Sequence, residues 1–212
     1  MSGLAVAVVR DGVTLASHRE EGRDQAARLL PAIAEALRTA GVERRSLSLL
    51  AVTIGPGSFT GVRVGLAAAR GLAVGLGLPL AGISTTATLL AQAASNDRLV
   101  VAAIDSRLGD WFCAISEGDP APFVVSTAEL ARRLKGRQSL IVGAEAEVLA
   151  ASIEGAVGQA ALPDPVVLAR LASAGNGVEL WRARNRDEGL PRPLYLRGVS
   201  VTMPDGARRT VD

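Results

Sequence analysis

The sequence contains very few of the side chains on which most catalytic sites depend. Its 212 residues include one histidine, His18, one cysteine, Cys113, and one lysine, Lys135. A single histidine excludes a zinc site with two histidine ligands. A serine–histidine–aspartate triad would have to use His18, at the end of a predicted strand, and no nucleophile-elbow sequence surrounds Ser58. We therefore predict no catalytic residue and no metal site.

The sequence also excludes a disulfide bond within the chain and contains few aromatic side chains. One cysteine cannot form a disulfide within the chain, and the apolar run that contains it, residues 111–115, predicts a small buried side chain. Aromatic residues make up 3% of the sequence and hydrophobic residues 49%. This composition excludes a disordered chain and predicts a core of alanine, valine, leucine and isoleucine.

No membrane-spanning or secretory segment is predicted. The N-terminal apolar run, residues 4–9, is too short for the core of a signal peptide. The longest apolar region, residues 64–83, contains Arg70, Pro79 and several glycines, which favours a buried or interface helix followed by a strand. We expect a cytoplasmic protein that contacts no membrane.

The charge balance gives little sign of a nucleic-acid-binding protein. The net charge is +2, and dense positive charge occurs only toward the C-terminus. Two interpretations of this basic tail stay open, a solvated segment and a weak contact with transfer RNA. Its arginines are Arg182, Arg184, Arg186, Arg192, Arg197, Arg208 and Arg209.

The spacing of apolar residues predicts an α/β protein built from two similar halves, residues 1–96 and 97–212. In each half we expect antiparallel strands extended by strands that follow a helical crossover. The first half has predicted strands at 4–9, 13–17, 49–54 and 80–84, and helices at 24–40, 61–77 and 85–94. The second has strands at 99–104, 111–116, 123–126 and 140–143, and helices at 128–134, 166–174 and 176–184, before an extended basic tail.

A glycine-rich loop between a buried strand and a small-residue helix is the most informative local feature. Its sequence, Ile-Gly-Pro-Gly-Ser-Phe-Thr-Gly, covers residues 54–61. We expect Thr60 to cap the helix, so that nearby N–H groups point outward with the positive end of the helix dipole. The loop is either a weak anion or nucleotide site or a tight turn that lets the helix pack flat on the sheet. The residues involved are Gly55, Gly57, Ser58, Thr60 and Gly61.

Several ordered motifs closely resemble the TsaB family, also called YeaZ. They are Gly-Pro-Gly-Ser-Phe-Thr-Gly-Val-Arg-Val-Gly from residue 55, Ala-Ala-Ile-Asp-Ser-Arg from residue 102 and Pro-Leu-Tyr-Leu-Arg from residue 193. The resemblance implies an actin-like, duplicated ribonuclease-H-type fold. It also implies a role in the bacterial synthesis of threonylcarbamoyl-adenosine in transfer RNA, as a non-catalytic partner of TsaD.

The N-terminus departs from the family pattern. Members usually begin with a strand of the type Ile-Leu-Ala-Ile-Asp-Thr-Ala, whereas residues 4–9 of this chain match the second strand of the family. The sequence is therefore either naturally short or begins late. We expect residues 4–9 to pair directly with residues 49–54 in a narrowed sheet, or an added upstream strand to raise stability. Without the family's first aspartate, Asp105 has no carboxylate opposite it.

Asp105 ends an apolar strand, where α/β sheets usually present ligand groups. It is a second weak candidate for an anion or nucleotide site. The alternative is an aspartate whose side chain caps the turn that follows. No intrinsic cofactor is expected, and ATP or ADP would bind at the level of a complex.

The helix after the glycine-rich loop is apolar on nearly every face, so packing on its own sheet cannot bury all of it. The resemblance implies that the first two helices pair with TsaD, or with a second copy when the protein is alone. TsaE and transfer RNA would be reached through the complex. The interface candidates are Leu30, Ile33, Arg63, Ala67, Arg70, Gly71, Val74 and Gly75.

Three functions from different classes are compatible with these features. The favoured one is a scaffold subunit of a threonylcarbamoyl-transferase complex. An ATPase or kinase of the actin-like fold is disfavoured because the first strand and its aspartate are missing. A peptidase of the glycoprotease type is disfavoured because the chain has one histidine.

Overall fold

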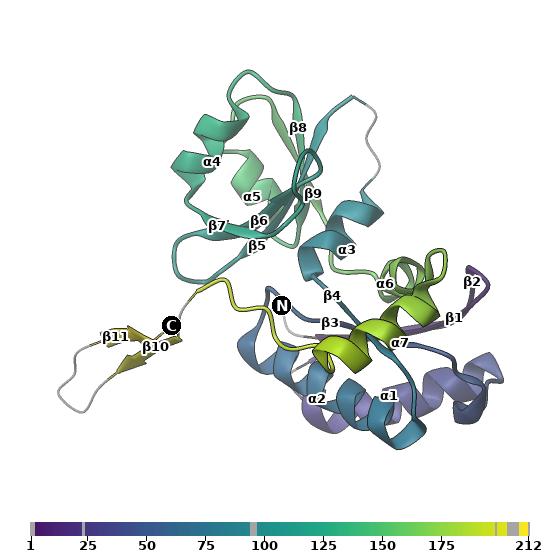
Figure 1. Ribbon diagram of the computed structural model, residues 1–212. Coiled ribbons are helices and arrows are strands. Elements are labelled where there is room, and N and C mark those ends of the chain that lie inside the picture. Colours follow the sequence, from purple (N-terminus) through teal and green to yellow (C-terminus); the bar gives the residue numbers. More distant parts are fainter. Residues whose placement is uncertain (1–2, 23, 94–96, 198, 203–207, 212) are drawn as a thin grey trace.

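The computed structural model describes residues 3–22, 24–93, 97–197, 199–202 and 208–211. It is a mixed α/β structure in which the second half, drawn in teal and green, lies against the first (Figure 1). The first half comprises β1 (Gly3–Arg10), β2 (Val13–Glu21), α1 (Gln25–Ala40), the short 3₁₀ helix η1 (Arg44–Ser46), β3 (Leu50–Thr53), α2 (Phe59–Leu76), β4 (Leu80–Ile83) and α3 (Thr85–Gln92).

The second half continues the chain with β5 (Leu99–Asp105), β6 (Trp111–Ile115), β7 (Phe123–Val125), α4 (Thr127–Leu134), β8 (Ser139–Gly143), α5 (Ala146–Ala150) and β9 (Ala156–Ala160). These strands form one five-stranded sheet in the order β7-β6-β5-β8-β9. The central strand, β5, is antiparallel to β6 and parallel to β8. The expected combination of antiparallel strands and crossover strands is confirmed in this half.

The two faces of β5 are both buried, which explains its uninterrupted apolar sequence. Val101 and Ala103 pack in a cluster with Leu130 of α4 and Leu149 of α5. On the opposite face, Val100 and Ala102 pack with Leu89 of α3. A helix from the first half therefore covers one face of the second sheet. The buried Cys113 on β6 belongs to the first of these clusters, as its apolar surroundings predict.

Two elements of the second half carried no recognisable sequence signal. Helix α5 has only five residues, and β9 reads Ala-Val-Gly-Gln-Ala, with a single β-branched residue. Gly158 makes their packing feasible, because a Cβ atom there would lie 2.4 Å from the Cα of Glu147 on α5. Only glycine permits so close an approach of helix and strand.

The strands of the first half form two separate pairs. β1 and β2 make an antiparallel hairpin through the turn Asp11-Gly12, where both residues have positive φ. β3 and β4 are parallel. Of the two expected outcomes, the direct pairing of residues 4–9 with residues 49–54 is wrong, because among the described strands β1 pairs only with β2 and β3 only with β4. The stabilising effect of an added upstream strand stays a prediction.

Helix packing explains why β1 and β3 stay apart. Helix α1 packs on β1 and β2, α2 packs on β3, and the two helices lie against each other. Packed helices have axes about 8–10 Å apart, roughly twice the ~4.8 Å between paired strands. Strands held beneath neighbouring helices are thus about one strand width too distant to pair. Helix α1 itself runs through Pro31 and ends at Gly41, which is left-handed as a C-cap.

After β9 the chain returns to the first half. Helix α6 (Pro165–Ser173) contacts β1, β2, β3 and β4, and α7 (Gly177–Glu188) contacts β4. The side chain of Asn185 on α7 accepts a hydrogen bond from the N–H of Leu80 at 2.6 Å and donates one to its carbonyl at 3.1 Å. Helices α6 and α7, which the expected boundary assigns to the second half, therefore pack on strands of the first half.

The described residues of the basic tail make contacts within the chain. Residues 191–197 run along the first half, and the N–H of Leu194 donates to the carbonyl of Ile54 at 2.8 Å. Strands β10 (Val199–Thr202) and β11 (Arg208–Val211) then form an antiparallel hairpin. The described residues of the expected extended tail therefore include two strands, which have extended backbone and pair with one another.

The burial of Cys113 predicts slow thiol chemistry and a pH-dependent stability. Burial raises the pKa of this thiol to about 12. An unfolded thiol loses its proton near pH 9 and the folded one does not, so the free energy of unfolding should fall as the pH rises from 9 toward 12. Urea denaturation at pH 7 and pH 10 measures this, and the Cys113→Ala variant should show a flatter pH dependence.

The same burial should slow the reaction of Cys113 with Ellman's reagent at least about 100-fold relative to the unfolded chain, because the thiol must be exposed by opening of the core. Fast reaction of the folded protein, or an equal pH dependence in Cys113→Ala, would contradict the placement of this side chain.

Candidate functional site

The glycine-rich loop connects β3 to α2 and is fixed on two sides. Its residues Gly55 and Pro56 are buried and joined by a cis peptide bond. The carbonyl of Gly55 accepts a hydrogen bond from the N–H of Thr85 at 2.8 Å, where α3 begins. A Cβ atom at Gly55 would lie 3.3 Å from the carbonyl oxygen of Leu194, and its φ of 103° favours glycine. The loop is therefore a packed junction between β3, α3 and the C-terminal segment.

The helix cap is Ser58, and the expected cap at Thr60 is wrong. The hydroxyl of Ser58 accepts from the N–H of Gly61 at 3.3 Å, and its carbonyl accepts from the N–H of Val62 at 2.9 Å. Helix α2 begins earlier than expected, at Phe59, which places Thr60 inside the first turn. Ser58 thus satisfies one of the N–H groups that an anion would otherwise bind.

An exposed cluster of two aromatic rings and one arginine lies at the start of α2. The guanidinium carbon of Arg63 is 3.6 Å from the ring centre of Phe59, and its Nε donates to the hydroxyl of Tyr195 at 2.9 Å. Phe59 is 53% exposed and Tyr195 is 48% exposed. This cation–π contact holds the charge of Arg63 beside the helix N-terminus. The contribution of Tyr195 had no sequence signal beyond the C-terminal motif, because 132 residues separate it from Arg63.

Asp105 caps its own turn. One carboxylate oxygen accepts from the backbone N–H of Arg107 at 2.7 Å, and the other lies 3.3 Å from the Arg107 guanidinium. The same guanidinium contacts Glu145 at 2.7 Å. Of the two interpretations of Asp105, turn capping is the one that the geometry displays. A ligand would have to compete with Arg107 for this carboxylate.

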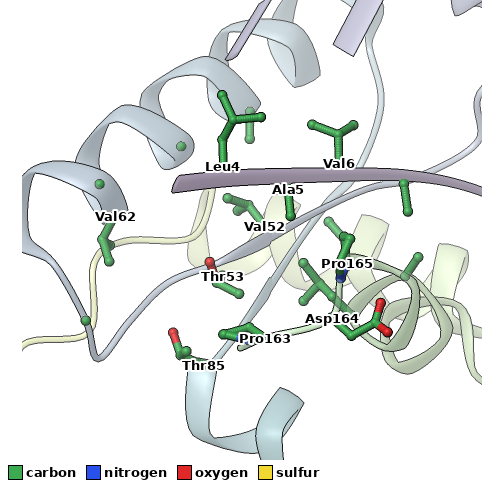
Figure 2. Close-up of a pocket in the computed structure, with 18 of the residues that line it drawn as sticks. Leu4, Ala5, Val6, Val52, Thr53, Val62, Thr85, Pro163, Asp164 and Pro165 are labelled. Carbon is green, nitrogen blue, oxygen red and sulfur yellow. The ribbon is translucent and has the colours of Figure 1, made fainter. Parts of the chain in front are cut away.

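Asp105 and most of the loop nevertheless line one cavity of about 1600 Å³. Figure 2 shows its inner part, with Leu4, Ala5 and Val6 of β1 across from Val52 and Thr53 of β3. Gly55, Gly57, Ser58 and Gly61 line it and Thr60 does not. Within the described ranges no group of three or more histidine, cysteine, aspartate or glutamate side chains could hold a metal ion. The anion or nucleotide site at Gly55–Gly61 and Asp105 stays a prediction.

The interface candidates on α2 lie on one exposed face. Arg63, Ala67, Arg70, Gly71, Val74 and Gly75 are all exposed. Val74 is 73% exposed, and added Cβ atoms at Gly71 and Gly75 would meet no atom within 4 Å. The opposite side of the helix buries Leu66 and Ala73. By length and composition alone, α2 would be long and apolar enough to cross a membrane, and 11% of it is buried.

The two candidates on α1 differ from each other. Leu30 is 54% exposed and belongs to the surface. Ile33 is half-buried and packs against the cluster of Val8, Ala16, Ala36 and Leu37. Ile33 is thus mainly a core residue of the first half, because the helix turns it toward β1 and β2.

Comparisons with known proteins agree with this architecture. The family model of TsaD, tRNA N6-adenosine threonylcarbamoyltransferase, matches residues 17–119. The tRNA threonylcarbamoyladenosine biosynthesis protein TsaB of Escherichia coli is 40% identical over 118 residues, which are 54% of this chain and 51% of that protein. TsaB of Haemophilus influenzae is 46% identical over 93 residues, 42% of this chain and 39% of that protein. These sequence matches span about half or less of the relatives' length.

A solved structure, YeaZ from Pseudomonas aeruginosa, superposes with a TM-score of 0.68 at 26% identity. It covers 92% of this chain and 94% of the YeaZ chain. The structural likeness is therefore much longer than the sequence matches, and the expected fold class is confirmed.

Because Asp105 is paired with Arg107, we expect the isolated chain to bind magnesium-ATP with a Kd weaker than about 1 mM. This corresponds to a binding free energy of less than ~4 kcal/mol in magnitude. Arg107 already pairs with the carboxylate, and Lys135 lies at the end of α4, outside the residues that line the cavity. Titration calorimetry with and without magnesium measures this. Micromolar, magnesium-dependent affinity would instead favour the kinase-like interpretation.

Proposed function

Because the chain belongs to the TsaB (YeaZ) family, we propose that it is a non-catalytic scaffold subunit for the formation of threonylcarbamoyl-adenosine in bacterial transfer RNA. TsaD would be its direct partner, and a second copy would take the place of TsaD when the protein is alone. The observation that carries this proposal is the exposed small-residue face of α2.

That face has the shape expected for a helix that meets another helix. Ala67, Gly71 and Gly75 follow one another at intervals of four residues and leave the backbone of α2 uncovered. Small side chains allow a partner helix to approach closely, so that van der Waals contact extends along the whole stripe. Leu30 on α1 and Val74 on α2 add exposed apolar area. An interior helix of a monomer would not present these residues to water.

Two arginines on this face would set the orientation of a partner helix. Arg63 is held in place by Phe59 and Tyr195. Arg70, which is exposed, forms no ion pair within the described part of the chain. An acidic group on the partner would complement both charges and fix the register of the two helices.

The proposed role does not require catalysis by this chain. The imidazole of His18 lies 3.5 Å from the carboxylate of Glu20 on the β1–β2 hairpin. Asp105 is paired with Arg107. We propose that the catalytic groups, any ATP or ADP, and the contact with TsaE reside elsewhere in the assembly, which would work in the cytoplasm.

Contact with transfer RNA through α7 is not favoured. Arg182, Arg184 and Arg186 lie 3.0–3.5 Å from Glu179, Glu188 and Asp187 respectively, so this helix carries little uncompensated positive charge. Phosphate binding depends on cations that are not already neutralised. We therefore propose that transfer RNA is reached through the complex and not through α7.

The exposed stripe predicts that Gly71→Leu weakens pairing without unfolding the protein. A Cβ atom added at this position would meet no atom within 4 Å, and replacing glycine within a helix favours the helix by up to about 1 kcal/mol. In a packed interface the added side chain should cost about 1–3 kcal/mol, which is a roughly 5–150-fold weaker Kd. Analytical ultracentrifugation, alone and with TsaD, measures the change.

Ala128→Leu is the matched control, because Ala128 is exposed on α4, in the second half and away from α2. It should leave both associations unchanged. If Gly71→Leu melts like the parent chain and pairs with unchanged affinity, α2 is not the interface and the proposal fails.

A further inference from the structure

The last parallel strand of each half lies at an edge of its sheet, and the two edges differ. In the first half this strand is β4, whose edge is closed by the side-chain amide of Asn185 on α7. The amide accepts from the N–H of Leu80 at 2.6 Å and donates to its carbonyl at 3.1 Å, as a neighbouring strand would. In the second half the corresponding strand is β9, and no described residue makes such bonds to its outer edge. The second sheet is therefore open at β9.

The hydrogen bonds between β8 and β9 identify the backbone groups on this open edge. The N–H of Ala161 donates to the carbonyl of Gly143 at 3.0 Å. Given the register of this parallel pair, the odd-numbered residues of β9 direct their N–H and C=O groups toward β8. The backbone groups of Gly158 and Ala160 therefore point outward. A further strand beside β9 would pair with them.

The sequence of β9 contains none of the features that usually prevent an edge strand from pairing. It reads Ala-Val-Gly-Gln-Ala, without a charge or a proline. At the other edge of the same sheet, β7 has only three residues and follows Pro120 and Pro122. The side chain of Val157 is 48% exposed beside the open edge, so an added strand would also cover apolar surface. β9 is thus suited to the addition of a strand through main-chain hydrogen bonds.

Strands β10 and β11 are an extended segment with two open edges of their own. They pair with each other, and Figure 1 shows them projecting away from both halves. A two-stranded hairpin is at best marginally stable in water, so a further contact would stabilise it. We propose that β11 adds to β9 of a second copy of this chain and extends its sheet by the hairpin. Reciprocal addition closes into a two-fold dimer. This pairing uses no residue of α2 and goes beyond the proposed scaffold role.

Charge complementarity favours β11 as the added strand. β11 contains Arg208 and Arg209. Glu147 lies over the middle of β9, because its Cα is 2.4 Å from the position of a Cβ atom at Gly158. Glu147 and Glu154 are both exposed, and neither forms an ion pair within the part of the chain that the structure describes. Two positive charges on the added strand would complement these carboxylates.

The position of α5 excludes the simplest alternative, in which β9 pairs with β9 of a second copy. Paired strands lie about 4.8 Å apart, whereas packed helices need about 8–10 Å between their axes. Because α5 lies directly over β9, two such strands would force their helices together. β11 belongs to a hairpin that stands apart from the helices, so it meets no such obstacle.

Residue-resolved hydrogen–deuterium exchange on the full chain tests the proposal. Between about 10 μM and about 1 mM protein, exchange at the amides of Gly158 and Ala160 should slow at least about threefold. The amides of Val157 and Gln159 should not change, because they already bond to β8. Association through α2 would leave all four amides unaffected, so this pairing and the scaffold role can fail separately.

A proline on the edge tests the backbone bonds. Ala160→Pro removes an outward N–H without removing a bond to β8, and proline is tolerated at such edge positions. This variant should lose the concentration dependence at Gly158. Gln159→Ala is the matched control, because it changes an exposed side chain and leaves the outward backbone groups intact. It should retain the concentration dependence.

A charge reversal on the hairpin provides a test that leaves both halves of the protein unaltered. Arg208→Glu combined with Arg209→Glu should abolish the concentration-dependent slowing at Gly158. Adding Glu147→Lys to this double variant should restore at least about half of the slowing, because the two strands again carry opposite charges.

Three results would overturn the proposal. The first is exchange at Gly158 and Ala160 that is fast at every concentration. The second is exchange that is slow at every concentration and accelerates in the double arginine variant, which would place the hairpin on β9 of its own chain. The third is concentration-dependent slowing that survives the double arginine variant, which would assign the edge to another segment.

Discussion

The packing of α6 holds the first half of the molecule together. The pairs β1–β2 and β3–β4 share no hydrogen bonds with each other, so the ladder that normally joins neighbouring strands is absent between them. Helix α6 contacts all four strands and α3, and α1 contacts α2 on the other side. Cohesion in this half is therefore a matter of side-chain packing between helices and strands, in contrast to the continuous sheet of the second half.

The sequence predicted well those features that depend on local patterns, and poorly those that depend on contacts across the chain. Apolar periodicity gave most helices and strands, and Asp11-Gly12 gave the first hairpin, because these signals are read within a few residues. Helix α5 and β9 were missed because Gly158 allows close packing without a strand-like sequence. The cap at Ser58 was misplaced because serine and threonine at positions 58 and 60 have the same chemistry.

The candidate site shows the same division. The glycine-rich loop and the open stripe of α2 were visible in the sequence, but their surroundings were not. No local rule connects Arg63 with Tyr195, or Asp105 with Glu145 through Arg107. Through those contacts Asp105 is paired with Arg107, and the side chain of Arg63 is held by Tyr195. At the two candidate positions, the charged side chains are thus already engaged within the described part of the chain.

The C-terminal segment 191–197 ties together parts of the chain that a hinge would need to separate. Leu194 is hydrogen-bonded to Ile54, Tyr195 to Arg63 in the first half, and Arg197 forms a salt bridge with Asp110 in the second. Two-lobed enzymes that close on a ligand rely on lobes able to rotate about a flexible link. In this protein a strap crosses from one lobe to the other, so rotation would have to break its bonds. Segment 191–197 therefore opposes a change in the angle between the two halves, and surfaces on different halves are linked through its bonds.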